Sequence, residues 1–176
     1  MSSQLNLTFI HPLLAIGGRF EPHQTSDLAS ALAVRAVVDL RLEDSDVLEI
    51  LTCHNIAFLR LPTKDHGAVA QDDLDRGVSF ANRHLDRGER VLVHCEHGIG
   101  RSATLALCIL AARGMEPLAA LELAKSKRSL VSPSPAQYEA WVRWLVRRGI
   151  CGPTGAPLPS FDAFKAIAYR HLAGTV

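Results

Sequence analysis

The stretch Val91-Leu92-Val93-His94-Cys95-Glu96-His97-Gly98-Ile99-Gly100-Arg101-Ser102 decides the fold of this chain. It begins with three apolar residues in a row, which is typical of a strand that is buried on both faces. Residues 103–112, which follow it, are apolar on nearly every side, so we expect a buried central helix there. A loop with two glycines therefore joins a core strand to the N-terminus of a core helix.

This loop combines a thiol with several groups that bind anions. A helix N-terminus carries partial positive charge and free N–H groups, and Gly98 and Gly100 allow successive N–H groups to face one point. Arg101 adds a planar fork that matches two phosphate oxygens. The same positive field is expected to lower the pKa of Cys95, because thiols near cations and helix N-termini ionise readily. The loop is thus predicted to supply both a nucleophile and a clamp for a phosphate dianion.

The order His-Cys, five residues, Arg-Ser resembles the signature of the cysteine-based protein tyrosine phosphatases. The likeness covers roughly residues 5–148, and the short chain is similar to the compact dual-specificity branch. It implies that Cys95 is the nucleophile, that Ser102 eases departure of the sulfur from a phosphocysteine intermediate, and that His94 orients the loop. It also implies a set of residues that bind phosphate, namely Glu96, His97, Gly98, Ile99, Gly100 and Arg101.

Two simpler interpretations of the loop are weaker. A buried cysteine beside a surface arginine would explain neither the two glycines nor the flanking strand and helix. A P-loop nucleotide-binding site is excluded, because no Gly-Lys-Ser/Thr ends the loop.

Phosphate transfer to a thiolate also needs an acid for the leaving oxygen. Asp65 is the candidate, because it follows a predicted strand at 56–61 and ligands of open α/β sheets bind beyond the carboxyl ends of strands. The phosphatase resemblance implies an acid on this same loop. His66 is the alternative acid, and a role in the turn is the alternative for Asp65.

Residues around the expected site each have two interpretations. Gln137 matches a glutamine that positions water in some members of the family, or it faces solvent. Asp39 and Arg41 end a core strand and either brace the site or form a structural salt bridge. Dual-specificity members often carry Asn near residues 132–134 to support the catalytic loop, whereas this chain has Ser-Pro-Ser-Pro at 132–135.

A small basic cluster, Lys125, Lys127 and Arg128, either receives an acidic substrate or forms a solvated helix end. Cys53 is a further candidate, as a partner that would form a disulfide with Cys95 under oxidation.

Length and composition agree with one soluble domain. The 176 residues are 48% hydrophobic, which suffices for a sizeable core. A net charge of +1 gives no argument for nucleic acid or a membrane surface as partner, and neither a transmembrane run nor a signal peptide is seen. The four scattered cysteines form neither a disulfide framework nor a zinc motif. We therefore expect a cytoplasmic protein that needs no metal or cofactor.

Strands followed by helices predict an α/β fold with a mostly parallel central sheet flanked by helices. Residues 1–150 are predicted to form the catalytic domain, and residues 151–176 a linker and a C-terminal helix packed on it. The predicted strands are 5–10, 13–16, 36–40, 56–61 and 91–93, and the predicted helices are 26–32, 46–53, 72–86, 103–112, 117–127, 135–148 and 161–172.

The predicted activity is hydrolysis of phosphotyrosine in a phosphoprotein substrate, with phosphoserine and phosphothreonine as further candidate residues. Inositol phosphates, phosphoinositides and other small phosphates are alternative substrates. Glu96, His97 and Ile99 give the loop no extra cation for such polyanions, and Glu96 would repel them. A phosphate-binding module without turnover is the alternative outside enzymes, and the presence of Cys95 and Arg101 argues against it.

Overall fold

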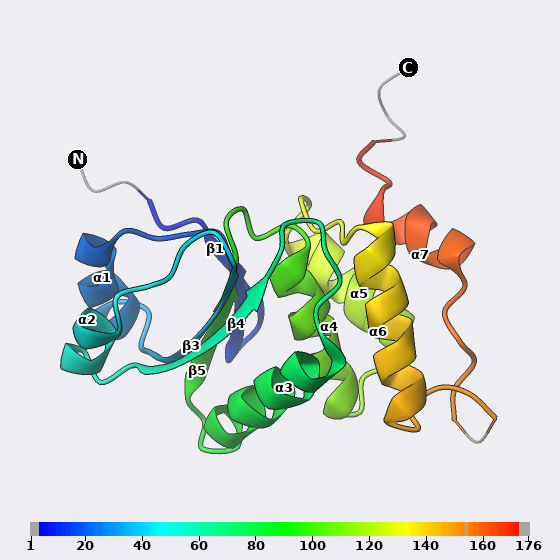
Figure 1. Ribbon diagram of the computed structural model, residues 1–176, viewed down its shortest axis with the longest axis horizontal. Helices are drawn as coiled ribbons and strands as arrows, with labels where there is room; N and C mark the ends of the chain where they lie inside the picture. The colour runs from blue at the N-terminus through cyan, green and yellow to red at the C-terminus, as the bar shows by residue number, and fades with distance from the viewer. Residues whose placement is uncertain (1–3, 154, 173–176) are drawn as a thin grey trace.

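The computed structural model describes residues 4–153 and 155–172. Its strands are β1 (Leu7–His11), β2 (Leu14–Gly17), β3 (Val34–Arg41), β4 (Ala57–Thr63) and β5 (Arg90–His94). Its helices are the 3-10 turn η1 (Pro22–Gln24), α1 (Thr25–Ser30), α2 (Leu48–Cys53), α3 (Gln71–Leu85), α4 (Arg101–Ala112), α5 (Pro117–Lys127), α6 (Pro135–Arg147) and α7 (Phe161–Ala168). The predicted α/β fold is confirmed (Figure 1).

The five strands form one sheet in the order β1-β2-β5-β3-β4. All neighbouring strands run parallel except β1 and β2, which are antiparallel. The strand before the cysteine, β5, therefore lies in the middle of the sheet. Because β2, β5, β3 and β4 run parallel, their carboxyl ends meet at one edge, where ligands bind in open sheets of this kind.

Helices cover both faces of the sheet, with α1 and α2 on one side and α3 to α7 on the other (Figure 1). The strand residues alternate between two apolar clusters, as the period of two in a strand requires. Val37 and Leu92 pack toward α1 and α2, whereas Val38, Val91 and Val93 pack in the larger cluster with α4. Every residue of β5 after Arg90 is buried, as the apolar run predicts.

The C-terminal helix α7 packs beside α5, and the Phe164 ring contacts Tyr138 and Trp141 of α6. The predicted helix at 161–172 is shorter in the structure, where it ends at Ala168 and turns follow. The predicted helix at 46–53 begins later, at Leu48, because the Asp46 carboxylate is bound by side chains of β3 and β5. Across the residues that the structure describes, every helix is too short or too polar to span a bilayer.

Candidate active site

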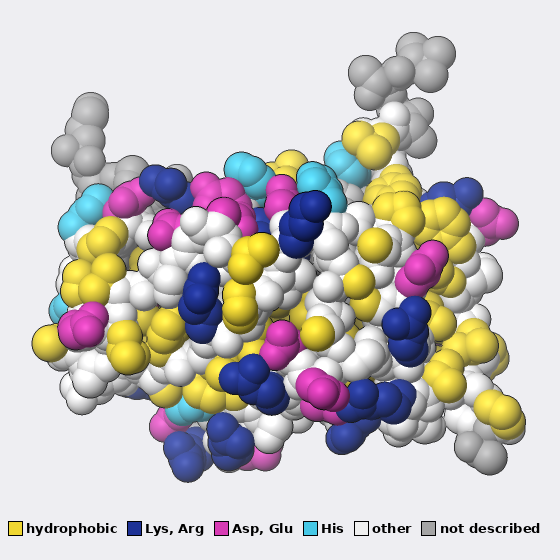
Figure 2. All heavy atoms as spheres, in the orientation of Figure 1, with side chains coloured by type: hydrophobic (Ala, Val, Ile, Leu, Met, Phe, Trp, Pro, Cys, Tyr) yellow, Lys and Arg dark blue, Asp and Glu magenta, His cyan; other side chains and the backbone are white. Residues whose placement is uncertain are grey.

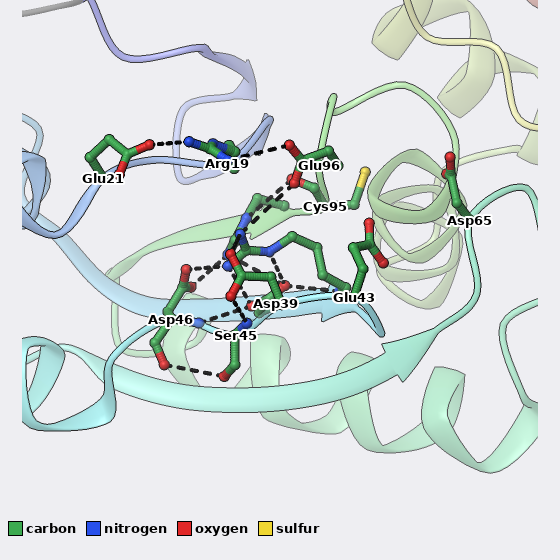
Figure 3. Close-up of polar contacts among 12 residues, drawn as sticks. Arg19, Glu21, Asp39, Glu43, Ser45, Asp46, Asp65, Cys95 and Glu96 are labelled. Atoms are coloured by element: carbon green, nitrogen blue, oxygen red, sulfur yellow. Dashed lines mark hydrogen bonds and ion pairs between the residues drawn. The ribbon is translucent and has the colours of Figure 1, made fainter.

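The catalytic loop, residues 95–100, connects the end of β5 to the start of α4. Register places Gly17, His94 and Asp39 side by side, so the segments that leave β2, β5 and β3 start next to one another. The segment after β4 carries Asp65 to the same edge, and Figure 3 shows Cys95, Glu43 and Asp65 around one point. The sheet therefore brings together residues that are distant in sequence.

Cys95 is buried, with 3% of its surface exposed. Its Sγ lies 3.3 Å from the Gly98 backbone nitrogen, which donates to it, and 3.4 Å from the Ser102 hydroxyl. Burial alone raises the pKa of Cys95, but the hydrogen bonds from Ser102 and Gly98 and the charge of Arg101 outweigh it, and the net pKa lies below that of an ordinary thiol. The geometry thus stabilises a thiolate at this position.

Arg101 is the first residue of α4 and is 1% exposed. Its two terminal nitrogens each donate at 2.8 Å to one oxygen of the Glu43 carboxylate, and one of them also donates to the Thr63 carbonyl at 3.0 Å. This fork holds the pKa of Glu43 at about 2 through the hydrogen bond. The Arg101 Nε is buried and has no partner among the described residues, so one N–H of the guanidinium remains for an acceptor.

Both loop glycines lie close to neighbouring segments, and Gly98 also needs its positive φ. Gly98 has a φ of +69°, and a Cβ there would lie 2.5 Å from the carbonyl carbon of Gly17. A Cβ on Gly100 would lie 2.4 Å from the Gln137 Oε1. The loop is therefore packed against β2 on one side and α6 on the other.

Arg128 supports the loop from outside. Its guanidinium donates to the carbonyl oxygens of Gly98 at 2.8 Å and of His97 at 2.9 Å. The Ser132 N–H donates to the Ile99 carbonyl at 3.0 Å. Three consecutive loop carbonyls are thus bound on the outer side, by Arg128 and by the N–H of Ser132, so the Ser-Pro-Ser-Pro segment supports the loop through its backbone.

Neither interpretation of the basic cluster agrees with the structure. Arg128 is buried against the loop, and Lys125 is also buried, with its ammonium donating to the carbonyls of Val131 and Ala168 at 2.8 and 2.7 Å. Burial lowers the pKa of Lys125 to about 8. Only Lys127 is exposed, so these residues form neither a cationic surface for substrate nor a solvated helix end.

Four buried charged groups lie behind the loop. The Arg41 guanidinium pairs with Asp39 at 2.8 Å and with Asp46 at 2.7 Å, and the His94 Nε2 lies 2.7 Å from the other oxygen of Asp46. Burial lowers the pKa of His94, but the hydrogen bond and charge of Asp46 and the charge of Asp39 outweigh it and raise the net pKa. Asp39 and Arg41 form the salt bridge that the sequence suggested. Through Asp46 this network extends to His94, which directly precedes Cys95.

The same cluster is the place where a metal would find ligands among the described residues. One ligand atom each of Asp39, Asp46 and His94 lie within 4.8 Å of one another. The Arg41 guanidinium already donates to both carboxylates. It supplies there the positive charge that a cation would bring, so the donor set fits a charge network better than a metal.

Asp65 lies on an exposed turn, and its Oδ1 is 3.1 Å from a terminal nitrogen of Arg101. The turn is attached to the start of α6, because Ser134 donates to the His66 carbonyl at 2.8 Å and Gln137 donates to the Gly67 carbonyl at 3.2 Å. His66 extends into solvent, with 88% of its side chain exposed. Gln137 is 1% exposed, so the prediction that it faces solvent is wrong.

Most of the predicted site residues line one cavity of about 60 Å³. It is lined by Asp65, His66, Cys95, His97, Ile99, Gly100, Ser132 and Gln137. The Glu96 side chain lies elsewhere, 3.8 Å from Arg19 and 4.0 Å from Arg41. The cavity thus places an acid, a thiol and a buried amide around a small volume.

All four cysteines of the chain are free. Cys53 is exposed at the end of α2. Strand β4 begins four residues later, and its first residue lies at the same height in the sheet as the start of β5. Cys95 follows the other end of β5. The two thiols therefore lie at opposite edges of the sheet, too far apart for the Cα separation of about 7 Å or less that a disulfide needs.

Sequence reasoning missed the roles of Glu43, Arg128 and Asp46. Glu43 follows the end of β3, and a carboxylate at the carboxyl edge of a core strand was the available signal. Arg128 contacts the loop across 30 residues of sequence, and no local pattern marks that contact.

Residues 19–145 match the model of the family "Dual specificity phosphatase, catalytic domain". The chain belongs to this family. Human dual specificity protein phosphatase 1 is 28% identical over 127 residues, which are 71% of this chain and 33% of that protein. The rat phosphatidylglycerophosphatase and protein-tyrosine phosphatase 1 is 39% identical over 83 residues, which are 46% of this chain and 43% of that protein.

Solved structures agree with this membership. The crystal structure of PTPMT1 in complex with PI(5)P aligns with a TM-score of 0.73 and 26% identity, and covers 80% of this chain and 96% of that one. The chain spans about a third of the length of the dual specificity phosphatases that it matches. The names of the similar proteins include both protein and lipid phosphatases.

Proposed function

We propose that the protein dephosphorylates phosphoproteins, with phosphotyrosine as the preferred residue, through a phosphocysteine intermediate. One observation carries the chemistry: a buried thiol whose pKa is lowered lies beside a buried arginine that keeps an unpartnered Nε. A phosphate oxygen is the acceptor that this N–H lacks.

In the first step, the Cys95 thiolate attacks phosphorus and an S–P bond forms as the bond from phosphorus to the leaving oxygen breaks. Asp65 transfers a proton to that oxygen, so the alcohol or phenol leaves neutral. Arg101 and the loop N–H groups hold the three equatorial oxygens, on which negative charge is spread. The Gly98 N–H donates instead to the sulfur, and so stabilises the thiolate.

In the second step, the Asp65 carboxylate accepts a proton from water while the water oxygen attacks phosphorus. The S–P bond breaks, inorganic phosphate is released and the thiolate is restored. The Ser102 hydroxyl, 3.4 Å from the sulfur, stabilises the departing thiolate. Gln137 lines the cavity with Asp65 and Cys95, and a role in positioning this water is part of the proposal.

The charge around the cavity favours a phosphoprotein over a polyanionic lipid. Glu43, Asp65 and Glu96 surround the loop, and its inner positions carry no lysine. A phosphoinositide is the second candidate, because the name of the rat relative and the PI(5)P complex point to lipid substrates in similar proteins. We further propose that residues 1–150 form the catalytic domain and 151–176 an attached linker and helix, and that the protein works in the reducing cytoplasm.

Hydrolysis of p-nitrophenyl phosphate, a phosphotyrosine peptide and vesicles with PI(5)P tests the proposal. Cys95→Ser should abolish activity on all of them, whereas Cys53→Ser, which changes an exposed thiol, should leave it intact. We expect the peptide to be hydrolysed faster than the lipid. Full activity in Cys95→Ser would disprove the mechanism, and faster hydrolysis of the lipid would disprove the substrate class.

A further inference from the structure

A cleft of about 240 Å³ opens beside the catalytic loop, between the segment after β2 and the segment that leads into α2. It is separate from the cavity that holds Cys95. The Arg19 N–H donates to the Glu96 carbonyl at 2.9 Å, and the Arg19 side chain lies between Glu21 and Glu96 (Figure 3). Glu96 follows Cys95 directly, so the wall of the cleft continues into the catalytic loop.

The cleft has an apolar floor and an acidic mouth. Phe20 and Leu51 on its floor are buried, with Ile50 beside them, and the buried Arg41–Asp46 ion pair lines the same floor. At the mouth, the side chains of Glu21 and Asp44 are 45% and 59% exposed. Glu21 is paired with Arg19 and Asp44 with Arg41, and each carboxylate also remains partly open to solvent. Apolar side chains below exposed carboxylates suit a long aliphatic side chain with a cationic tip.

Negative charge is in excess around this cleft. Among the described residues, the carboxylates in and directly behind it are those of Glu21, Asp39, Asp44, Asp46 and Glu96. The cations that face them are Arg19, Arg41 and His94. Arg60 is a fourth cation nearby, because it donates to the backbone carbonyl of Asp44 at 3.2 Å. Even with His94 protonated, the carboxylates exceed these cations by one. Figure 2 shows acidic side chains along the upper edge of this face, from α1 toward β4, with some Lys and Arg side chains among them.

We propose that this cleft is a specificity subsite for a lysine or arginine side chain that flanks the phosphorylated residue of a protein substrate. The proposal rests on the proposed function, because it assumes a phosphopeptide in the catalytic cavity. The aliphatic stem of the basic residue packs on the apolar floor, and its cation meets Glu21 and Asp44. A second phosphate group is disfavoured here, because the excess carboxylates would repel it.

Three phosphotyrosine peptides test the subsite. They carry lysine, alanine or glutamate at the three positions on each side of the phosphotyrosine and are otherwise identical. For the wild-type protein, we expect kcat/KM to fall in the order lysine, alanine, glutamate, with about a 10-fold span between the first and the last. The span should shrink in 0.5 M salt, because added ions screen exposed charges.

The variant Glu21→Gln with Asp44→Asn removes the two exposed carboxylates while keeping similar shapes. We expect the ratio of kcat/KM between the lysine and alanine peptides to fall about 3-fold or more in this variant. Asp162→Asn is the matched control, because it removes one exposed carboxylate of α7. That control should keep the wild-type ratio.

The outcomes distinguish a failure of the subsite from a failure of the proposed phosphatase function. Hydrolysis of the alanine peptide above the Cys95→Ser background shows that the protein acts on phosphopeptides, whatever the flanking residues do. Equal kcat/KM values for the three peptides would then overturn the subsite alone. A preference for lysine that survives the double variant would also overturn it, because the cation would be bound elsewhere.

Discussion

The Nε of Arg128 donates to the carbonyl oxygen of Gly98 at 2.8 Å, although 30 residues of sequence separate them. A second nitrogen of the same guanidinium donates to the preceding carbonyl, that of His97. A peptide group whose C=O is bound on the outside of the loop has its N–H directed to the other side. Arg128 is therefore a positioning residue for the anion-binding side of the loop.

Replacing Arg128 by methionine should lower both stability and kcat. Two buried carbonyls would lose their donor, which costs about 1–3 kcal/mol of unfolding free energy. Displacement of the loop should lower kcat by about 10²-fold, because small errors of position are costly in catalysis. Urea unfolding and hydrolysis of p-nitrophenyl phosphate measure the two effects. Lys127→Met, which removes the neighbouring exposed cation, should change neither, and equal behaviour of the two variants would contradict the role of Arg128.

Glu43→Gln should weaken catalysis without a large loss of stability. Glu43 is exposed and holds both terminal nitrogens of Arg101, so its amide would bind only one of them well. We expect kcat/KM to fall about 10-fold. Because the pKa of Glu43 is about 2, its carboxylate stays ionised in the working range and the ratio of variant to wild type should be constant from pH 5 to 8. Glu49→Gln on α2 is the control. A ratio that varies with pH would mean that the loss of activity does not come from the bond between Glu43 and Arg101.

Asp65→Ala should lower kcat by about 10²–10⁴-fold on phosphotyrosine peptides, whose leaving oxygen needs a proton. The loss should be much smaller on p-nitrophenyl phosphate, because nitrophenolate leaves readily without one. His66→Ala tests the alternative acid. If His66→Ala instead shows this dependence on the leaving group, the acid is His66.

Stability should depend on pH through His94. Its folded pKa is raised, so its contribution is fully present below the unfolded pKa of about 6.5 and is lost as pH rises through the folded pKa. Urea unfolding of the wild type should therefore show a loss of at most about 1.4 kcal/mol per pH unit in that range. Asp46→Asn removes the partner that raises the pKa and should flatten this slope. A slope unchanged in Asp46→Asn would mean that another group titrates.

Local patterns were enough to predict the part of the site that lies within one strand–loop–helix unit. Cys95, Ser102 and Arg101 share such a unit. Its apolar run and its glycines predict a buried strand followed by a tight loop and a helix. The Ser134–Gln137 capping box is also a local signal, and it turns the Gln137 side chain back toward the start of α6. The roles of these residues in catalysis remain predictions until variants are measured.

Contacts across the sheet could not be predicted in the same way. The bond between Arg101 and Glu43 depends on the order of the strands, in which β3 is the neighbour of β5. Lys125 and Arg128 were ambiguous for a related reason. A charged residue at a helix end is usually solvated, and only carbonyls supplied by distant segments make its burial favourable.

The ammonium of Lys125 binds the carbonyls of Val131 and Ala168, and so joins the segment before α6 to the end of α7. A chain shortened at residue 150 would remove two partners of this buried ammonium, the Ala168 carbonyl and the His171 Nδ1, which lies 2.7 Å from it. The segment between Lys125 and Ser132 also carries the groups that hold the catalytic loop. Removing α7 to leave a minimal catalytic fragment should therefore lower the activity, although this helix contributes no residue to the proposed reaction.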